Sequence, residues 1–353
     1  MTVNHAARKM GHAEDTDGDR SLSCLPGNLL PLSATTHLDR LGFGAAFVFI
    51  KVGFDIMLDV SAPRTVVYLL RVHTSRKKDL QTKEHFRTVP DLPREEYIDS
   101  FGNHCGRINL PEGCTTLQLL NDAVIHDSGF ADEYAPFARQ LDVSELPVET
   151  LGFLLSSRYC EVDSELLDFA WNRFQATPLG WARVQAICDF VHGHLTFNYG
   201  LARSNRSALE AFHERSGVCR DFAHLAITLC RCMNIPARYV TGYLGDIAVP
   251  QDRAPMDFCA WFEVFLGDRW YTFDARHNRR RVGRIVIARG RDAVDVPIMM
   301  VFGPHSLSRF TVVTEEVDPV EFISHRNPFA FSKPSQPQIR RHAQPSRAGE
   351  ASG

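Results

Sequence analysis

Cys219 is the residue of this sequence best placed to act as a nucleophile. It stands at the predicted start of a helix over about 219–233, where free backbone amides and the helix dipole favour the thiolate. Arg220 beside it adds positive charge, and Gly217 leaves room for a tight approach of the chain at this corner. We therefore expect the pKa of Cys219 to lie below the ~8.5 of a free cysteine.

A nucleophilic cysteine needs a base and a group that orients the base, and a hairpin over 259–276 is positioned to supply them. If Gly267 and Asp268 form its two-residue turn, strand pairing puts Cys259 and Asp274 on one face of the sheet. They are then diagonal neighbours roughly 7 to 8 Å apart. A base at position 259 would therefore reach an orienting carboxylate at Asp274, and the residue at that position is a second thiol.

Two histidines near these residues fit the role of base less well. His277 follows Asp274 by three residues, and strand alternation points it to the opposite face unless a bulge intervenes. His224 lies about 140° around the helix from Cys219, which favours a packed or hydrogen-bonded role. His277 remains the minority alternative for the base.

The sequence predicts no metal site and no cofactor. His192 and His194 end a helix, where histidine is common, and no second pair of ligands stands at a suitable spacing. Cys230 and Cys232 lie about 200° apart on one helix and cannot hold one metal from one face. The basic run 279–284 is typical of a solvated face, with recognition of an acidic substrate as the alternative.

The elements that must position these residues fall into two regions of different periodicity. Residues 44 to about 128 alternate between apolar and polar, as in 54–60, which predicts a β-rich module. From about Ser164 the period moves towards 3.6 and predicts helices, one of them starting at Ser207 with Glu210 as its capping-box partner. Strands are then expected at 237–244, 260–266, 269–274, 284–288 and 310–317.

The order and spacing of four segments resemble the core of the transglutaminase-like superfamily. The segments are 217–225 (GVCRDFAHL), 234–243 (NIPARYVTGY), 260–264 (AWFEV) and 270–274 (WYTFD). The resemblance covers roughly 155–290. The β-rich region before it, with 99–103 (DSFGN), is similar to the amino-terminal module of bacterial transglutaminase-like proteins.

The resemblance implies a papain-like α+β core in which Cys219 forms a thioester with an amide carbonyl and Asp274 orients the base. Where the family usually has His-Ala-Trp, this chain has Cys259-Ala260-Trp261. A general base commonly contributes roughly 10² to 10⁴ in rate. The sequence is therefore consistent with two functions. The first is a thiol hydrolase or acyltransferase that acts on peptide or protein amides, closer to a protease or amidase than to a cross-linker. The second is a non-catalytic relative that binds peptides.

The length of 353 residues allows two domains with flanking segments. We predict a disordered arm over 1–42 and a β-rich module over 43–150. A transglutaminase-like core with carboxy-terminal strands follows over 151–325, and a disordered basic tail over 326–353.

Composition excludes several classes of protein. With 39 basic against 42 acidic residues the chain lacks the basic excess that nucleic-acid binding requires. The apolar stretch 43–58 carries Lys51 and Asp55, too polar for a membrane helix, and no secretory signal opens the sequence. Nine cysteines at irregular spacings indicate reduced thiols in the cytoplasm. The expected partner is thus a peptide or protein amide substrate, and the oligomeric state stays open.

Overall fold

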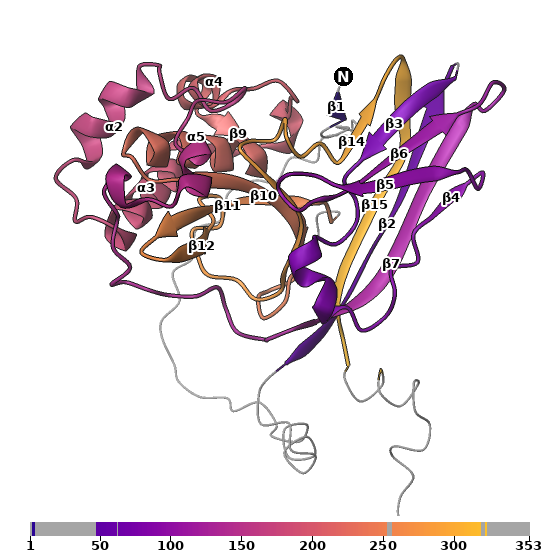
Figure 1. Cartoon of the computed structure of the whole chain (residues 1–353), viewed down its shortest axis with the longest axis horizontal. Helices are drawn as coiled ribbons and strands as arrows, with labels where there is room; N and C mark the ends of the chain where they lie inside the picture. Colours follow the sequence, from indigo (N-terminus) through magenta and orange to yellow (C-terminus); the bar gives the residue numbers. More distant parts are fainter. Residues whose placement is uncertain (1, 4–46, 62, 253–255, 319–321, 323–353) are drawn as a thin grey trace, which may run out of the picture. The chain divides into compact units, whose positions relative to one another are not determined.

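The computed structural model describes residues 2–3, 47–61, 63–252, 256–318 and 322 (Figure 1). The chain divides into two units, Met1–Glu316 and Val317–Gly353, and the first holds the sheets and helices of the candidate site. The predicted arm and basic tail lie outside the described residues, except that Thr2–Val3 forms the short strand β1.

The amino-terminal region is built from two β-sheets, as the alternating sequence predicted. One has the strand order β15 (His305–Val317), β2 (Val48–Val60), β7 (Thr116–Asp127) and β4 (Arg87–Val89). The other has the order β1, β14 (Met299–Val301), β3 (Arg64–Tyr68), β6 (His104–Leu110) and β5 (Arg94–Ile98). Alternate residues of β2 from Phe54 to Val60 are buried, because one face of the strand packs inward.

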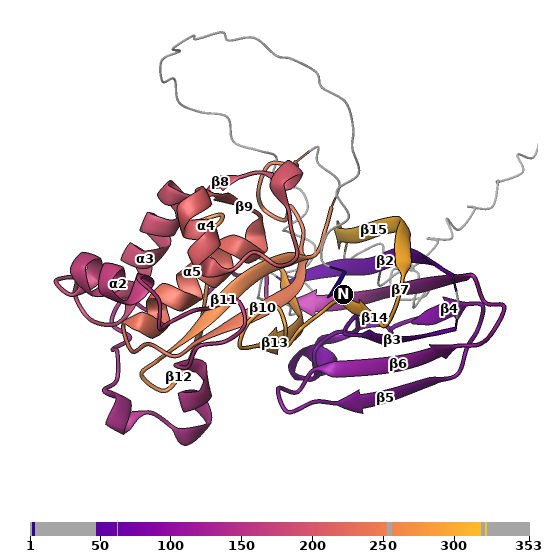
Figure 2. The ribbon, with the colours of Figure 1, turned by 90° about the horizontal axis from the view of Figure 1, so that it is seen from above.

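The two sheets of this module lie one above the other (Figure 2). Their buried side chains belong to one hydrophobic core. The ring of Tyr68 in β3 stacks on Phe86 with ring centroids 4.9 Å apart. Phe86, which lies just before β4, also contacts Phe54 in β2 edge-on. Aromatic side chains thus join both sheets across the interior.

The strands β14 and β15 follow the core in sequence and yet complete the sheets of the module. Met299–Val301 pairs antiparallel with β3, and His305–Val317 lies beside β2. The sequence predicted a strand at 310–317, and we assigned it to the core. Alternation of apolar and polar residues indicates a strand but does not show which strands it pairs with. The module is therefore made from two segments that flank the core.

The core consists of an antiparallel sheet covered by helices. The sheet has the order β12 (Arg269–Phe273), β11 (Cys259–Leu266), β10 (Ala237–Leu244) and β13 (Arg284–Gly290). The helices are α2 (Leu166–Phe174), α3 (Trp181–His194), α4 (Ala208–Glu214) and α5 (Cys219–Cys232). Helix α5 packs on β10 and β11, and the other three helices pack against α5 (Figure 1). The predicted α+β class is confirmed.

Two helix starts follow the sequence signals closely. At α4 the Ser207 hydroxyl accepts a hydrogen bond from the Glu210 amide at 3.3 Å, and the Glu210 carboxylate accepts one from the Ser207 amide at 2.9 Å. This is the predicted capping box. Helix α5 begins at Cys219, and every one of its residues is buried. Its polar side chains need internal partners, as when Arg231 donates to the carbonyl of Ala237.

Hydrogen bonds join the module to strand β13 of the core. The Asn103 side chain donates to the Arg289 carbonyl at 2.7 Å and accepts from the Arg289 amide at 2.8 Å. The backbone amide of His73 donates to the carbonyl of Val286 at 3.0 Å. Asn103 is completely buried, so these bonds are shielded from water. The module is therefore fixed to the sheet that carries the candidate site.

Candidate active site

The start of α5 is held in place by a buried carboxylate. Asp221, in the first turn, accepts a hydrogen bond from the Val218 amide at 2.9 Å and one from Arg206 at 2.8 Å. A Cβ atom on Gly217 would lie 2.6 Å from the Cβ of Asp221, so only glycine fits there. Cys219 is consequently fixed at the corner where the chain enters the helix, as the sequence predicted.

Arg220 does not supply the positive charge that we expected beside Cys219. Its guanidinium is buried and paired with Asp221 at 3.1 Å, and it also donates to the carbonyl of Ser204 at 2.7 Å. The cation that acts on the thiol is Arg276, whose charge favours the Cys219 thiolate. Arg276 lies over the ring of Phe197, with 3.8 Å from the guanidinium carbon to the ring centroid.

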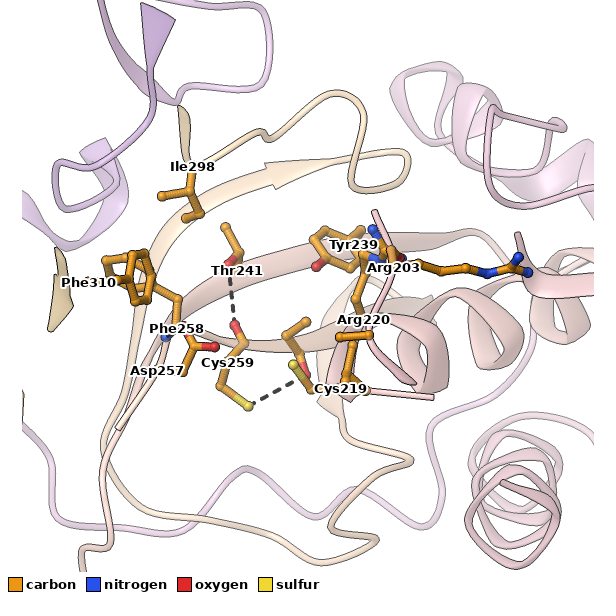
Figure 3. Close-up of a pocket in the computed structure, with 13 residues that line it drawn as sticks. Arg203, Cys219, Arg220, Tyr239, Thr241, Asp257, Phe258, Cys259, Ile298 and Phe310 are labelled. Carbon is orange, nitrogen blue, oxygen red and sulfur yellow. Dashed lines mark hydrogen bonds between the residues drawn. The ribbon is translucent and has the colours of Figure 1, made fainter. Parts of the chain in front are cut away.

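Cys259 opens strand β11 and faces Cys219. The two sulfur atoms lie close together (Figure 3), and the sulfur of Cys259 also contacts the carbonyl of Ala260 at 3.7 Å. An interaction between the two thiols shifts the pKa of each. The carbonyl of Cys259 accepts a hydrogen bond from the Thr241 hydroxyl of the neighbouring strand at 3.3 Å. Cys219 is 4% exposed and Cys259 6% exposed, so bulk water contributes little to their interaction.

The pKa values of the two thiols are shifted in opposite directions. Donating its hydrogen bond to Cys259, together with burial, raises the pKa of Cys219 well above its ordinary value. Accepting that bond lowers the pKa of Cys259 to about 7, against the opposing effect of burial. The expected lowering at Cys219 is therefore wrong, because the helix start does not outweigh a neighbouring thiol that holds the negative charge.

Asp274 lies directly after strand β12. The register of the hairpin agrees with the predicted turn, since Leu266 pairs with Arg269 and Phe262 pairs with Phe273. Burial alone would raise the pKa of Asp274, but the guanidinium of Arg284, 2.9 Å from its carboxylate, holds that pKa well below the usual value. Asp274 therefore stays ionised inside the protein.

His277 contacts Asp274, contrary to the expectation from strand alternation. Strand β12 ends at Phe273, and residues 275–277 form a turn. One oxygen of Asp274 accepts from the amides of Arg276 and His277, each at 3.0 Å, and the other lies 2.8 Å from Nδ1 of His277. Alternation applies only within a strand, so it fails once the chain turns.

Two further groups that the sequence left out support this turn. Nδ1 of His192, at the end of α3, lies 2.9 Å from the carbonyl of Arg276. Arg284 bridges Asp274 and Asp132, with 2.9 Å to each. Arg281 and Arg284 are buried, so a solvated face is the wrong interpretation for them, although residues 279–280 are exposed. The sequence signals for Arg284 are its place in the basic run 279–284 and at the start of a predicted strand, and neither indicates its contact with Asp274.

His224 plays the structural role that its position on the helix predicted. It is completely buried, its ring stacks on Tyr159, and Nε2 accepts a hydrogen bond from the amide of Ala293 at 3.1 Å. Burial holds its pKa well below the usual value. A neutral, enclosed imidazole of this kind belongs to the packing of the core.

The two thiols line a pocket between α5 and the core sheet (Figure 3). Tyr239, Thr241, Asp257 and Phe258 form part of its wall, with Ile298 and Phe310 farther from the sulfurs. Phe310 belongs to β15, so the module contributes to the wall. Within the described ranges, no cluster of three or more His, Cys, Asp or Glu residues is placed to hold a metal ion.

The fold and this cysteine-centred site define a class of protein. The profile described as "Transglutaminase-like superfamily" matches residues 171–275. A solved structure titled "Putative Cysteine Protease" from Cytophaga hutchinsonii is 31% identical and superposes with a TM-score of 0.68, covering 78% of this chain and 92% of that one. The chain belongs to the transglutaminase-like superfamily.

Two relatives are similar along much of this chain. An uncharacterized protein of Mycobacterium leprae is 31% identical over 237 residues, which cover 65% of this chain and 83% of the relative. An uncharacterized protein of Mycobacterium tuberculosis is 26% identical over 259 residues, which cover 67% of this chain and 81% of the relative. Among the helices in the described part of the chain, none combines the length and apolar composition needed to cross a bilayer.

Proposed function

We propose that this protein is a thiol hydrolase or acyltransferase that acts on peptide or protein amides through a thioester on Cys219. The observation that carries the proposal is that Cys219 at the start of α5 and Cys259 at the start of β11 line one pocket. It pairs a nucleophile with a proton acceptor, the arrangement that thiol catalysis requires.

The chemistry begins with attack of the Cys219 sulfur on the carbonyl carbon of the amide. Cys259, whose pKa of about 7 suits a base at neutral pH, accepts the proton from Cys219. The carbon–nitrogen bond then breaks, and Cys259 returns the proton to the leaving amine. The amides of Asp221 and Phe222 donate to the carbonyl of Val218, so the amides of Cys219 and Arg220 at the very start of α5 are the ones available to stabilise the developing oxyanion. Water or an amine finally attacks the thioester.

Asp274 acts in this scheme as a positioning residue. It holds His277 through a 2.8 Å contact, and the charge of His277 helps to lower the pKa of Cys259. Arg284 contacts the same oxygen of the carboxylate at 2.9 Å. His277 also offers a second candidate for the base, since its Nδ1 is engaged by Asp274 and Nε2 is then the nitrogen left to accept a proton.

A second candidate function is peptide binding without catalysis. The observation that favours it is the identity of the group that contacts Cys219, which is a thiol where the family usually has an imidazole. A pocket that joins apolar Phe258 and Phe310 to polar Thr241 suits a peptide in either case. Turnover distinguishes the two functions.

The test measures hydrolysis of a mixture of fluorogenic peptide amides by the full-length protein. Cys219→Ala should abolish hydrolysis, and Cys259→His should raise it by up to about 10² to 10⁴-fold if an imidazole is the better base. Cys114→Ala is the matched control, because it removes a thiol that does not line the pocket. Cys114 is half-exposed and contacts the carbonyl of Thr116. Hydrolysis that survives in Cys219→Ala would refute the thioester, and peptide binding without any hydrolysis would favour the second function.

A base at His277 gives a different pattern of activity. His277→Ala would then lower the rate of hydrolysis at least as far as Cys259→Ser, whereas a base at Cys259 predicts the larger loss in Cys259→Ser. Rates measured with both variants therefore assign the proton acceptor.

The proposed location is the cytoplasm. Nine cysteines at irregular spacings support it, because thiols stay reduced and disulfides are rare in the cytoplasm. Cell fractionation tests the assignment, and recovery of the protein outside the cytoplasmic fraction would contradict it.

A further inference from the structure

The pair formed by Cys219 and Cys259 is suited to a second kind of chemistry besides amide cleavage. The sulfurs face each other from the start of α5 and the start of β11 (Figure 3). This helix and this strand pack directly against each other. A disulfide needs two sulfurs about 2.05 Å apart on backbones that are already close. Because the two thiols line one pocket on directly packed elements, they meet the requirement that the backbones be close.

Other thiols in the described part of the chain have different surroundings. Cys160, Cys188 and Cys230 are fully enclosed, and burial raises the pKa of each. Cys219 and Cys259 instead line a pocket and lie beside the guanidinium of Arg276, which favours a thiolate there. A small oxidant that enters the pocket therefore meets two neighbouring thiols, one of them in the reactive form.

We propose that Cys219 and Cys259 form a reversible disulfide when hydrogen peroxide enters the pocket, and that this modification switches off the thiol activity. Only the second half of the proposal rests on the proposed function, since formation of the bond needs no amide substrate.

The oxidation proceeds in two steps that balance. The thiolate of the pair attacks one peroxide oxygen, so that a sulfur–oxygen bond forms, the oxygen–oxygen bond breaks and the departing hydroxide takes up a proton to become water. The second sulfur then attacks the resulting sulfenic acid, a disulfide forms, and the oxygen leaves as a second molecule of water. Each sulfur loses one electron, and one peroxide is reduced to two waters. Dithiothreitol reverses the reaction by thiol exchange.

A neighbouring thiol also changes the fate of Cys219 under oxidation. Without a partner, a sulfenic acid continues to the irreversible sulfinic acid. With Cys259 lining the same pocket, closure of the disulfide competes with that second oxidation. The thiol that replaces the usual imidazole would thus protect the nucleophile.

The experiment treats the full-length protein with hydrogen peroxide, blocks free thiols and maps peptides by mass spectrometry without reduction. We expect a cross-link between the peptides that carry Cys219 and Cys259, which dithiothreitol removes. Cys114→Ser should give the same cross-link. In Cys259→Ser the peptide that carries Cys219 should instead reach the sulfinic acid.

Sulfinic acid on Cys219 with Cys259 still a free thiol in the wild-type protein would overturn the proposal. That result needs no variant, so a folding defect in Cys259→Ser leaves the test intact. The cross-link is read by mass and not by turnover. A cross-link in a protein that hydrolyses no amide would support the disulfide and count against the proposed function. Hydrolysis without any cross-link would refute the disulfide and leave the proposed function standing.

Discussion

Two thiols that share a hydrogen bond behave as one acid with two ionisations. The first proton leaves readily because the remaining S–H group stabilises the thiolate, and the second is retained because two negative sulfurs would repel each other. Cys259 has a pKa of about 7, and the pKa of Cys219 is raised well above its ordinary value. The pair therefore carries a single negative charge over a wide range of pH above neutrality.

The rate of alkylation should report this first ionisation. Because only the thiolate reacts, labelling of the pair by iodoacetamide should rise with pH through a midpoint of about 7. Cys259→Ser removes the thiol that raises the pKa of Cys219, so the pKa of Cys219 should fall from its wild-type value. Mass spectrometry of labelled peptides over a pH series measures both. A midpoint at or above the ~8.5 of a free cysteine in the wild-type protein would contradict the shared proton.

At this scale the sequence was a poor guide to the contacts of the candidate site residues. The spacing of the motifs pointed to Cys219, Cys259 and Asp274. It placed His277 on the wrong face, because the contact with Asp274 depends on the residue at which β12 ends. The positive charge of Arg220 was also a poor guide to the pKa of Cys219, because Arg220 is paired with the carboxylate of Asp221 in the same turn.

The entry of the chain into α5 positions the thiol of Cys219. Gly217 and Asp221 are in contact at this point, and the Asp221 carboxylate also accepts from the amide of Val218. The sequence predicted this helix and the strand 237–244 closely, because periodicity and turn residues act locally. It could not reveal that Arg206 would pair with Asp221, since that contact depends on tertiary structure.

Gly217→Ala tests the role of this corner. The added methyl group would lie 2.6 Å from Asp221, so we expect a loss of about 1 to 3 kcal/mol in the free energy of unfolding. Gly193→Ala is the control, because no atom lies within 4 Å of the added Cβ and the residue is inside α3. That variant should stay within about 0.5 kcal/mol of the wild type, because Gly193 is exposed near the end of the helix. Urea unfolding measures both, and equal stabilities would show that the corner is not tightly packed.

The module and the core form one framework around the pocket. Strands β14 and β15 return the chain from the core to the module, and Phe310 of β15 reaches the wall of the pocket. The sequence predicted a β-rich module and an α+β core, and both are confirmed. It could not assign the last strands, because alternation fixes which residues face inward and leaves the neighbouring strand undetermined. The division of the chain at residue 150 stays a prediction.

Asn103→Ala tests the connection between module and core. Removing the side chain leaves the backbone of Arg289 without two hydrogen bonds in a buried position, and we expect a loss of about 2 kcal/mol or more in the free energy of unfolding. Asn109→Ala is the matched control, since its exposed bond to the Thr65 hydroxyl should contribute less than about 0.5 kcal/mol. Equal stabilities of the two variants would show that Asn103 does not secure this connection.

The central claim is that Cys219 carries the acyl group, and trapping that group tests it most directly. The protein is mixed with p-nitrophenyl acetate, quenched in acid within the first turnover and mapped by mass spectrometry. We predict one acetyl group, located on Cys219 and absent from Cys219→Ala. An acetyl group on Cys259 that persists in Cys219→Ala, or no acetylated cysteine at any time, would contradict the assignment of Cys219 as the nucleophile.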